Sequence, residues 1–332
     1  MFRLAYANVI KFIAAILVIT THSFCLSQNQ PDPLYLATNN QISLGAIAVS
    51  IFFMYSGIYI NKSIQRTKKA RKYLYKRCIR LFPALIIVIL FSVFVLGPLL
   101  TTFKISDYFI NKTTFLYLLN ILLIPIHNLP GVFTSNCYNP TVNGALWTLP
   151  IEFICYIVLL LFWLTSNKSC KIKLKYLNVI ALFINLILLI IAMLYGNDLI
   201  ISAIRAIVFF FIGTCLYDFA KYIKLHFVGL IIVFVCLIIS FIMRLANFAI
   251  ILFFPYFILC LTFLFPKIKN FKLFNISYEM YLLGFPIQQT LVHFWGGQMP
   301  ILINFTLALP IDIILGFIVY KISNIIISKL RK

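Results

Sequence analysis

Apolar runs close to 20 residues long recur along the chain, mostly separated by short polar gaps. A helix of ~20 residues crosses the hydrocarbon core of a bilayer, and lipid-exposed backbone must close its hydrogen bonds internally. Hydrophobic residues make up 63% of the 332 residues and charged residues 11%, against about half and about a quarter in soluble domains. The sequence therefore predicts an all-α, polytopic membrane helical bundle.

We expect about ten transmembrane helices in a single domain covering residues 1–332. The N-terminal run lacks a small-residue cleavage site, so it is expected to stay as the first span. The eight cysteines show neither CxxC nor metal-ligand spacing, so no zinc site is expected. The expected spans are 7–26, 42–61, 81–100, 147–166, 176–195, 199–219, 225–243, 246–265, 274–294 and 300–320.

Basic residues gather in alternate gaps, above all in Asn61 to Pro83, which holds nine Lys or Arg and no acid. If both termini are cytoplasmic, 24 of the 28 basic residues face the cytoplasm, as the positive-inside rule requires. Membrane topology then explains the net charge of +21, and no nucleic-acid partner is expected. This predicts a multi-pass protein of the cell (inner, cytoplasmic) membrane.

The longest gap, residues 101–146, is expected to be extracytoplasmic. Its apolar part, 113–126, is too short to span, and a span there would turn the four lysines of 167–175 outward. We therefore expect 113–126 to be re-entrant or interfacial. Residues 127–146, rich in Asn, Pro and Gly, are expected to form an irregular loop.

Two ionisable residues are expected near the outer face, and such groups inside spans are candidates for function. A neutral His22 can take a proton from a hydroxyl, although an interfacial histidine bonded to a carbonyl would look the same in sequence. Glu152 can orient an imidazolium, bind a hydroxyl or pair with Arg205. Trp147 also suits an interfacial anchor.

Arg77 and Arg80 lie one helical turn apart at the expected cytoplasmic mouth of the third span. We expect both to project from one face, where guanidinium groups suit phosphate oxygens. The competing explanation is that these arginines serve only the positive-inside rule and bind no ligand. The acids Asp198, Asp218 and Glu279 lie near expected span ends, where water or headgroups are expected to solvate them.

Five stretches together resemble the integral-membrane acyltransferase family 3, whose members O-acetylate bacterial surface polysaccharides such as O-antigen and exopolysaccharide. They occur in the family's order and extend over nearly the whole chain. The stretches are KFIAAILVITTHSF with His22, VSIFFMYSGIYI (Val49 to Ile60), KRCIRLFP with Arg77 and Arg80, NGALWTLPIEFICY with Trp147 and Glu152, and ISYEMYLLGFPI (Ile276 to Ile287).

The resemblance implies a cytoplasmic acyl-CoA donor, usually acetyl-CoA, and a hydroxyl of a lipid-linked or exported glycan as acceptor. His22 matches the catalytic histidine, Glu152 the acid after the Trp motif, and Arg77 with Arg80 the coenzyme-binding RxxR. Lys11 stands where many members have Arg, and Gly284 where many have a second histidine. We further expect Trp147, Arg205, Tyr278 and Tyr281 to contact the acceptor, membrane lipid to be a partner, and no metal to be needed.

Lys11 and His22 are 11 residues apart, or roughly 16 Å of helix rise, which a pantetheine arm can bridge. His22 would then deprotonate the acceptor hydroxyl or take the acyl group itself. Two other classes stay open: a transporter or flippase for a glycan or lipid precursor, and a non-catalytic scaffold. The absence of repeated halves disfavours a transporter.

Overall fold

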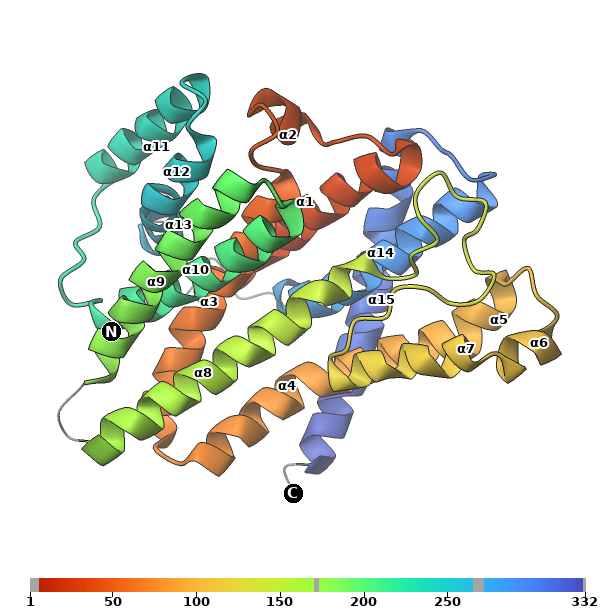
Figure 1. The fold of residues 1–332 in the computed structure, drawn as a ribbon, viewed down its shortest axis with the longest axis horizontal. Coiled ribbons are helices and arrows are strands. Elements are labelled where there is room, and N and C mark those ends of the chain that lie inside the picture. The colour runs from red at the N-terminus through yellow and green to blue at the C-terminus, as the bar shows by residue number, and fades with distance from the viewer. Residues whose placement is uncertain (1–5, 170–172, 265–271, 331–332) are drawn as a thin grey trace. The chain divides into compact units, whose positions relative to one another are not determined.

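The computed structural model describes residues 6–169, 173–264 and 272–330. The regular elements in these ranges are helices, and the only β pairing there is an isolated bridge between Thr101 and Val132 (Figure 1). The all-helical prediction is confirmed. The basic residues Arg3, Lys171, Lys267, Lys269, Arg331 and Lys332 of the charge analysis lie outside the described ranges.

Seven helical segments in the described ranges are long and apolar enough to cross a membrane. Each coincides with one of the expected spans, although several extend beyond the predicted ends. They are α1 (Ala7–Gln28), α3 (Leu44–Thr67), the run from α4 (Ala70–Phe91) to α5 (Gly97–Leu100), η3 (Gly144–Trp147) with α8 (Thr148–Ser169), α9 (Leu174–Tyr195), α10 (Asp198–Asp218) and α15 (Ile301–Leu330).

The three other expected spans are helical but differ from single straight spans. α11 (Phe227–Ile242) has 16 residues, and α12 (Ala246–Leu252) meets α13 (Phe254–Phe263) at a 45° bend that would make an eighth span if the pair crosses as one. α14 (Ser277–Phe294) carries the polar residues Glu279, Gln288 and Gln289 in its 18 residues and is not among the seven. The count of ten and the orientation of the termini stay predictions.

Contacts divide the chain into two compact units, each built from three separate stretches. Unit 1 comprises Met1–Ala14, Pro33–Tyr75 and Ile151–Phe271, and unit 2 comprises Ala15–Asp32, Lys76–Pro150 and Lys272–Lys332. The expectation of a single domain over the whole chain stays a prediction.

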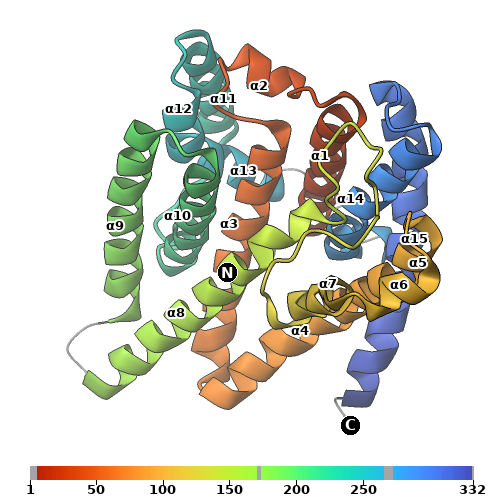
Figure 2. The same ribbon diagram turned by 45° about the vertical axis from the view of Figure 1, so that its right-hand side comes forward.

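In unit 1, α10 packs against both α3 and α9 (Figure 2). The crossing with α3 is close because glycine stands on each side of it. A Cβ on Gly57 would lie 2.0 Å from the carbonyl oxygen of Phe210, and one on Gly213 would lie 2.1 Å from that of Met54. Small residues of this kind let membrane helices approach backbone to backbone.

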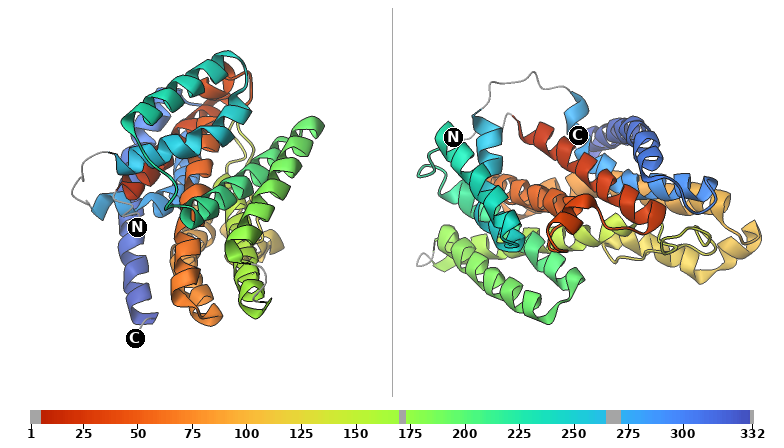
Figure 3. Two further views of the ribbon diagram at one scale, coloured as in Figure 1. Left: turned by 90° about the vertical axis from the view of Figure 1, so that its left-hand side faces the viewer. Right: turned by 90° about the horizontal axis from the view of Figure 1, so that it is seen from above.

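In unit 2, α14 packs along α15, and both are coloured blue in Figure 3. A hydrophobic core joins α4 to the loops that follow it and to α14. Between α4 and α5 the helix widens into a π-helical turn, η1 (Ser92–Leu96), and the Tyr108 hydroxyl donates to the carbonyl of Val93 within it at 2.9 Å. The hydroxyl replaces helix hydrogen bonding that the widened turn disturbs.

The stretch expected to be re-entrant is a broken helical piece, α7 (Lys112–Leu116) followed by the 3-10 helix η2 (Tyr117–Leu122). The Asn120 side chain closes it, donating to the carbonyls of Tyr117 and Ile126 at 2.8 and 2.9 Å. The segment is too short to span a bilayer as a helix. Its entry into the bilayer stays a prediction.

One expectation about the acids was wrong. Glu279 was expected to be solvated at a span end, but it is only 6% exposed, inside the first turn of α14. The first turn of α14 is buried within the protein. A prediction from the length of the apolar run instead places the start of this helix at the membrane surface.

Candidate active site

His22 lies in the second half of α1, within unit 2, with its ring against Phe285 of α14. The ring centroids are 5.0 Å apart in an edge-to-face arrangement, and Tyr138 packs against the same phenyl ring at 6.2 Å. The Nδ1 atom of His22 is buried and has no hydrogen-bond partner among the described residues. A neutral imidazole has one acceptor nitrogen and one donor nitrogen. A ring nitrogen that the protein leaves unused is available to a ligand.

The helix turn around His22 is held by Gln288 of α14, which is fully buried. Its Nε2 lies 2.9 Å from the carbonyl oxygen of Ile19, 2.8 Å from Ser23 Oγ and 2.8 Å from Asn304 Oδ1 of α15. Ile19 and Ser23 flank His22 by one turn at most on either side, so this contact fixes the rotation of α1. Gln288 was not among the predicted site residues, although a glutamine inside an apolar run was a usable signal.

The loop that precedes α8 is fastened to α14 by amide side chains. The Asn143 side chain donates to the carbonyl of Leu282 at 2.8 Å, and Gln289 donates to the carbonyls of Asn139 and Thr141 at 3.1 and 3.0 Å. A Cβ on Gly144 would lie 2.7 Å from the Phe285 ring. Only glycine therefore lets the loop lie against the ring that supports His22.

Trp147 ends the 3-10 helix η3 and is half-buried. Two predicted acceptor-binding tyrosines support the adjoining segments. The Tyr281 hydroxyl donates to the carbonyl of Ala145 at 2.9 Å, and the Tyr278 hydroxyl donates to the carbonyl of Leu81 at 2.9 Å. These bonds give both tyrosines a structural role, and their contact with an acceptor stays a prediction.

Arg77 and Arg80 lie one turn apart on α4, as expected, but in different surroundings. Arg77 is 8% exposed, whereas Arg80 is on the surface. The Tyr278 bond to Leu81, the residue after Arg80, ties this turn to α14. The pair thus offers one exposed and one sheltered guanidinium on a fixed helix.

Glu152 belongs to unit 1, where hydroxyl groups surround it. Ser56 Oγ donates to Glu152 Oε1 at 2.7 Å, and the Tyr156 hydroxyl donates to the same oxygen. Ser56 belongs to the second of the five stretches and Glu152 to the fourth, so the structure joins two motifs that the sequence separates. Both of these bonds engage the same carboxylate oxygen, Oε1.

Arg205 does not pair with Glu152 in the described structure. It is 5% exposed and donates from Nη2 to Asn247 Oδ1 at 2.8 Å. Gln41 joins the same cluster by accepting from the backbone of Asn247 at 3.2 Å. Lys11 also lies in unit 1, with its Nζ 5.4 Å from the centroid of the Tyr59 ring, in cation–π geometry.

Asp312, in the middle of α15, is a buried acid that was not among the predicted site residues. It is fully buried, and neither carboxylate oxygen has a hydrogen-bond partner among the described residues. A Cβ on Gly284 of α14 would lie 3.5 Å from Asp312 Oδ2. An ionisable residue inside a span was the available signal.

Comparison with known proteins identifies the family. A model of the acyltransferase domain of acyltransferase family 3 matches residues 4–327. A protein of Shigella phage Sf6 described as an O-acetyl transferase is 36% identical over 153 residues, which is 45% of this chain and 42% of the phage protein. The alignment thus spans less than half of that relative. No solved structure matches the chain. Because the family match extends over nearly all of its length, and several described helices are long and apolar enough to cross a bilayer, the chain is a multi-pass membrane protein that belongs to acyltransferase family 3.

Proposed function

We propose that the protein is an O-acetyltransferase of the cytoplasmic membrane that moves an acetyl group from acetyl-CoA to a hydroxyl of a cell-surface or lipid-linked glycan. Family membership supports acyl transfer, and the phage relative supports O-acetylation. The observation that carries the assignment of a base is His22, whose buried Nδ1 has no protein partner in the described structure.

In the proposed reaction His22 accepts the proton of the acceptor hydroxyl. The hydroxyl oxygen then attacks the thioester carbonyl, the carbon–sulfur bond breaks, and the imidazolium returns its proton to the leaving thiolate. The products are an O-acetylated glycan and free CoA. In an alternative mechanism His22 first takes the acetyl group and then passes it to the acceptor hydroxyl. This mechanism gives the same products, and it stays open.

The other predicted residues take binding roles in this proposal. Arg77 and Arg80 bind phosphate oxygens of the donor, a task for which planar guanidinium groups are suited. Glu152 binds an acceptor hydroxyl through Oε2, in the way that Oε1 already binds the hydroxyls of Ser56 and Tyr156. Lys11 supplies a further positive charge for the donor.

The direct test is thiol release by the purified protein with acetyl-CoA and candidate glycans. His22→Ala is expected to reduce acetyl transfer by about 100-fold or more, the usual contribution of a general base. His226→Ala, on an exposed histidine at the start of α11, is the matched control and should transfer normally. Undiminished transfer by His22→Ala would remove His22 from the mechanism. Glycan movement without thiol release would favour a transporter.

A further inference from the structure

Unit 1 contains a polar cavity of about 540 Å³, at the end where α3, α8 and α10 finish and α9 begins. Small-molecule sites usually measure about 300–1,000 Å³. The proposed acetyl transfer uses none of the residues that line this cavity. Its chemistry therefore has to be explained by a different ligand.

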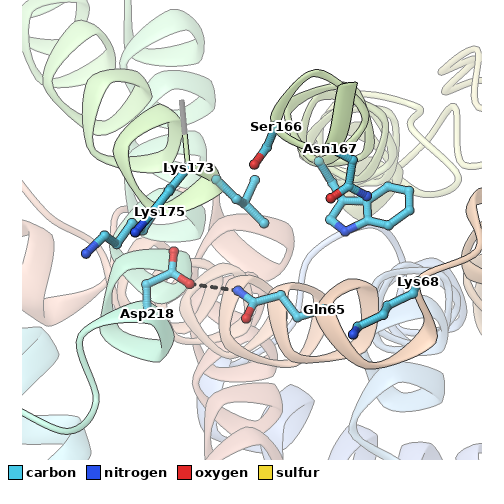
Figure 4. A pocket seen from close by; sticks show the side chains of 9 residues that line it. Gln65, Lys68, Ser166, Asn167, Lys173, Lys175 and Asp218 are labelled. Carbon is cyan, nitrogen blue, oxygen red and sulfur yellow. Dashed lines mark hydrogen bonds between the residues drawn. The ribbon is translucent and has the colours of Figure 1, made fainter. Parts of the chain in front are cut away.

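The cavity is basic on two opposite sides. Figure 4 shows Lys68 from the end of α3 on one side, and Lys173 and Lys175 from the start of α9 on the other. Both Lys68 and Lys173 are exposed, so their ammonium groups are open to a ligand that enters the cavity. Three positive charges around one hollow favour an anion there.

One acid, Asp218, also lines the cavity, and its charge is largely engaged by the protein. Its two carboxylate oxygens accept from the side-chain amides of Gln65 and Asn178 at 2.8 Å each. Lys175 also interacts with it electrostatically. The other two lysines therefore remain to bind an anionic ligand.

The start of α9 adds backbone donors to these lysines. Lys173 is the N-cap of α9, and its side chain makes no capping hydrogen bond. Leu174 and Lys175, the first two residues of the helix, line the cavity with it. The first N–H groups of a helix have no partner within the helix and can donate to phosphate oxygens.

An exposed apolar stripe on α9 begins three residues after Lys173. It consists of Tyr176, Ile180, Phe183 and Ile187, which are between 50% and 62% exposed. Their spacing of four, three and four residues places them on one face of the helix. Because α9 is long and apolar enough to cross a membrane, this α9 stripe is suited to contact with lipid chains.

The cavity and the α9 stripe together fit an amphipathic ligand. A phosphate group meets the lysines, and hydrocarbon attached to it meets the stripe. A soluble phosphate compound could bind the lysines but would make no use of the stripe. The continuity of the two surfaces along α9 therefore favours a phospholipid.

The side of the membrane follows from the charge pattern. Lys68 belongs to the basic stretch Asn61 to Pro83, and the lysines of α9 belong to the basic gap 167–175. The positive-inside rule predicts that both are cytoplasmic. Trp163 of α8, which also lines the cavity, is a residue type common at the membrane interface. Basic pockets between membrane helices on this side suit lipid headgroups.

We propose that the cavity binds the headgroup of an anionic glycerophospholipid from the cytoplasmic leaflet. Lys68, Lys173 and the first N–H groups of α9 bind the phosphodiester, and an acyl chain lies along the α9 stripe. The lipid links the end of α3 to the start of α9, and both helices pack on α10. Bound lipid therefore stabilises unit 1, and its binding does not depend on acetyl transfer.

Lys68 offers a substitution that removes charge without disturbing the backbone. It caps α3 with φ 50° and ψ 19°, a left-handed conformation that favours glycine. Lys68→Gly therefore removes the ammonium group and relieves the backbone. In the absence of lipid this variant should be at least as stable as the wild type, so weaker lipid binding would not result from misfolding.

The first experiment titrates the delipidated full-length protein with phosphatidylglycerol or phosphatidylcholine and measures binding by native mass spectrometry. Phosphatidylglycerol should bind more tightly, and Lys68→Gly and Lys173→Gln should each weaken it about tenfold, since a hydrogen bond to a charged group is lost. Lys221→Gln, on an exposed lysine of unit 1 that does not line the cavity, is the control. Equal binding of phosphatidylglycerol by the wild type and all variants would overturn the proposal.

The second experiment separates a lipid from a soluble phosphate compound. Glycerophosphoglycerol, the headgroup without its chains, competes against phosphatidylglycerol for the wild-type protein. It should bind at least tenfold more weakly than the lipid, because it buries no hydrocarbon on the α9 stripe. Equal affinity of the headgroup and the lipid would identify a site for a soluble phosphate compound and overturn the assignment to lipid.

The third experiment measures thermal unfolding in nanodiscs of phosphatidylcholine, with and without phosphatidylglycerol. A ligand that binds only the folded protein raises its Tm. Phosphatidylglycerol should raise the Tm of the wild type and of Lys221→Gln, and should raise that of a Lys68→Gly, Lys173→Gln double variant much less. An equal rise in all three proteins would show a general effect of surface charge and contradict a headgroup site in this cavity.

Discussion

His22 differs from the three other histidines in the surroundings of its ring. His127 Nδ1 lies 3.5 Å from the carbonyl oxygen of Asn143, His293 Nδ1 lies 3.4 Å from Ser135 Oγ, and His226 is exposed. Only His22 combines a buried Nδ1 with the absence of a partner among the described residues. Burying an unused polar atom costs about 1–3 kcal/mol, so retaining it favours a function in binding or proton transfer.

Asp312 presents the same argument for a carboxyl group. Replacing it with leucine should raise the free energy of unfolding by about 1–3 kcal/mol, because two buried oxygens without partners are removed. Acetyl transfer should fall, as expected where a destabilising group is kept for function. Thermal unfolding in detergent and thiol release measure the two effects.

The control for this prediction is Asp312→Asn, which keeps the shape and polarity of the side chain. It should not gain the stability of the leucine variant, because the amide also lacks partners. An Asp312→Leu protein that is more stable and fully active would show that the acid has no function. A destabilised one would show that the carboxyl group has a stabilising partner.

At the scale of elements, the crossing of α3 and α10 depends on two glycines. Gly57→Ala places a methyl group against the carbonyl of Phe210, and a backbone atom cannot turn aside as a side chain can. The substitution should lower the free energy of unfolding by about 1–3 kcal/mol, the usual effect of overpacking. Because Ser56 is the next residue, hydrogen bonding to Glu152 should be disturbed as well.

Gly316→Ala in α15 is the matched control for this crossing. Its nearest neighbour would be the flexible side-chain atom Met280 Cγ, at 3.3 Å. Alanine also has the higher helix propensity. Thermal unfolding of the two variants should therefore differ clearly, and equal stability would show that α3 and α10 tolerate a wider separation.

At the scale of the whole molecule, the helices were predictable because the bilayer imposes one length and one kind of hydrogen bonding on a span. The long runs that became α1, α3, α9 and α10 show this. The bend between α12 and α13 was not predicted, although Pro255 lies in the first turn of α13. Hydropathy averages over a window and does not detect a change of direction.

The site was predictable only in part, for a related reason. Residues inside a short motif could be proposed from the sequence, as His22, Arg77 and Glu152 were, and their roles stay predictions. Contacts between distant segments could not: Gln288 meets Ser23 across 265 positions, and Ser56 meets Glu152 across 96. Asp312 was missed although a single acid inside an apolar span was a usable signal. Three-dimensional packing is what distinguishes these residues from their neighbours.

Mass spectrometry of cell-surface glycans, from cells that carry the gene, lack it, or carry His22→Ala, tests whether the protein acetylates glycans through His22. Acetylated glycan is expected only with the intact gene, while the His22→Ala protein is present in the membrane at normal levels. Identical acetylation in all three strains would contradict that expectation.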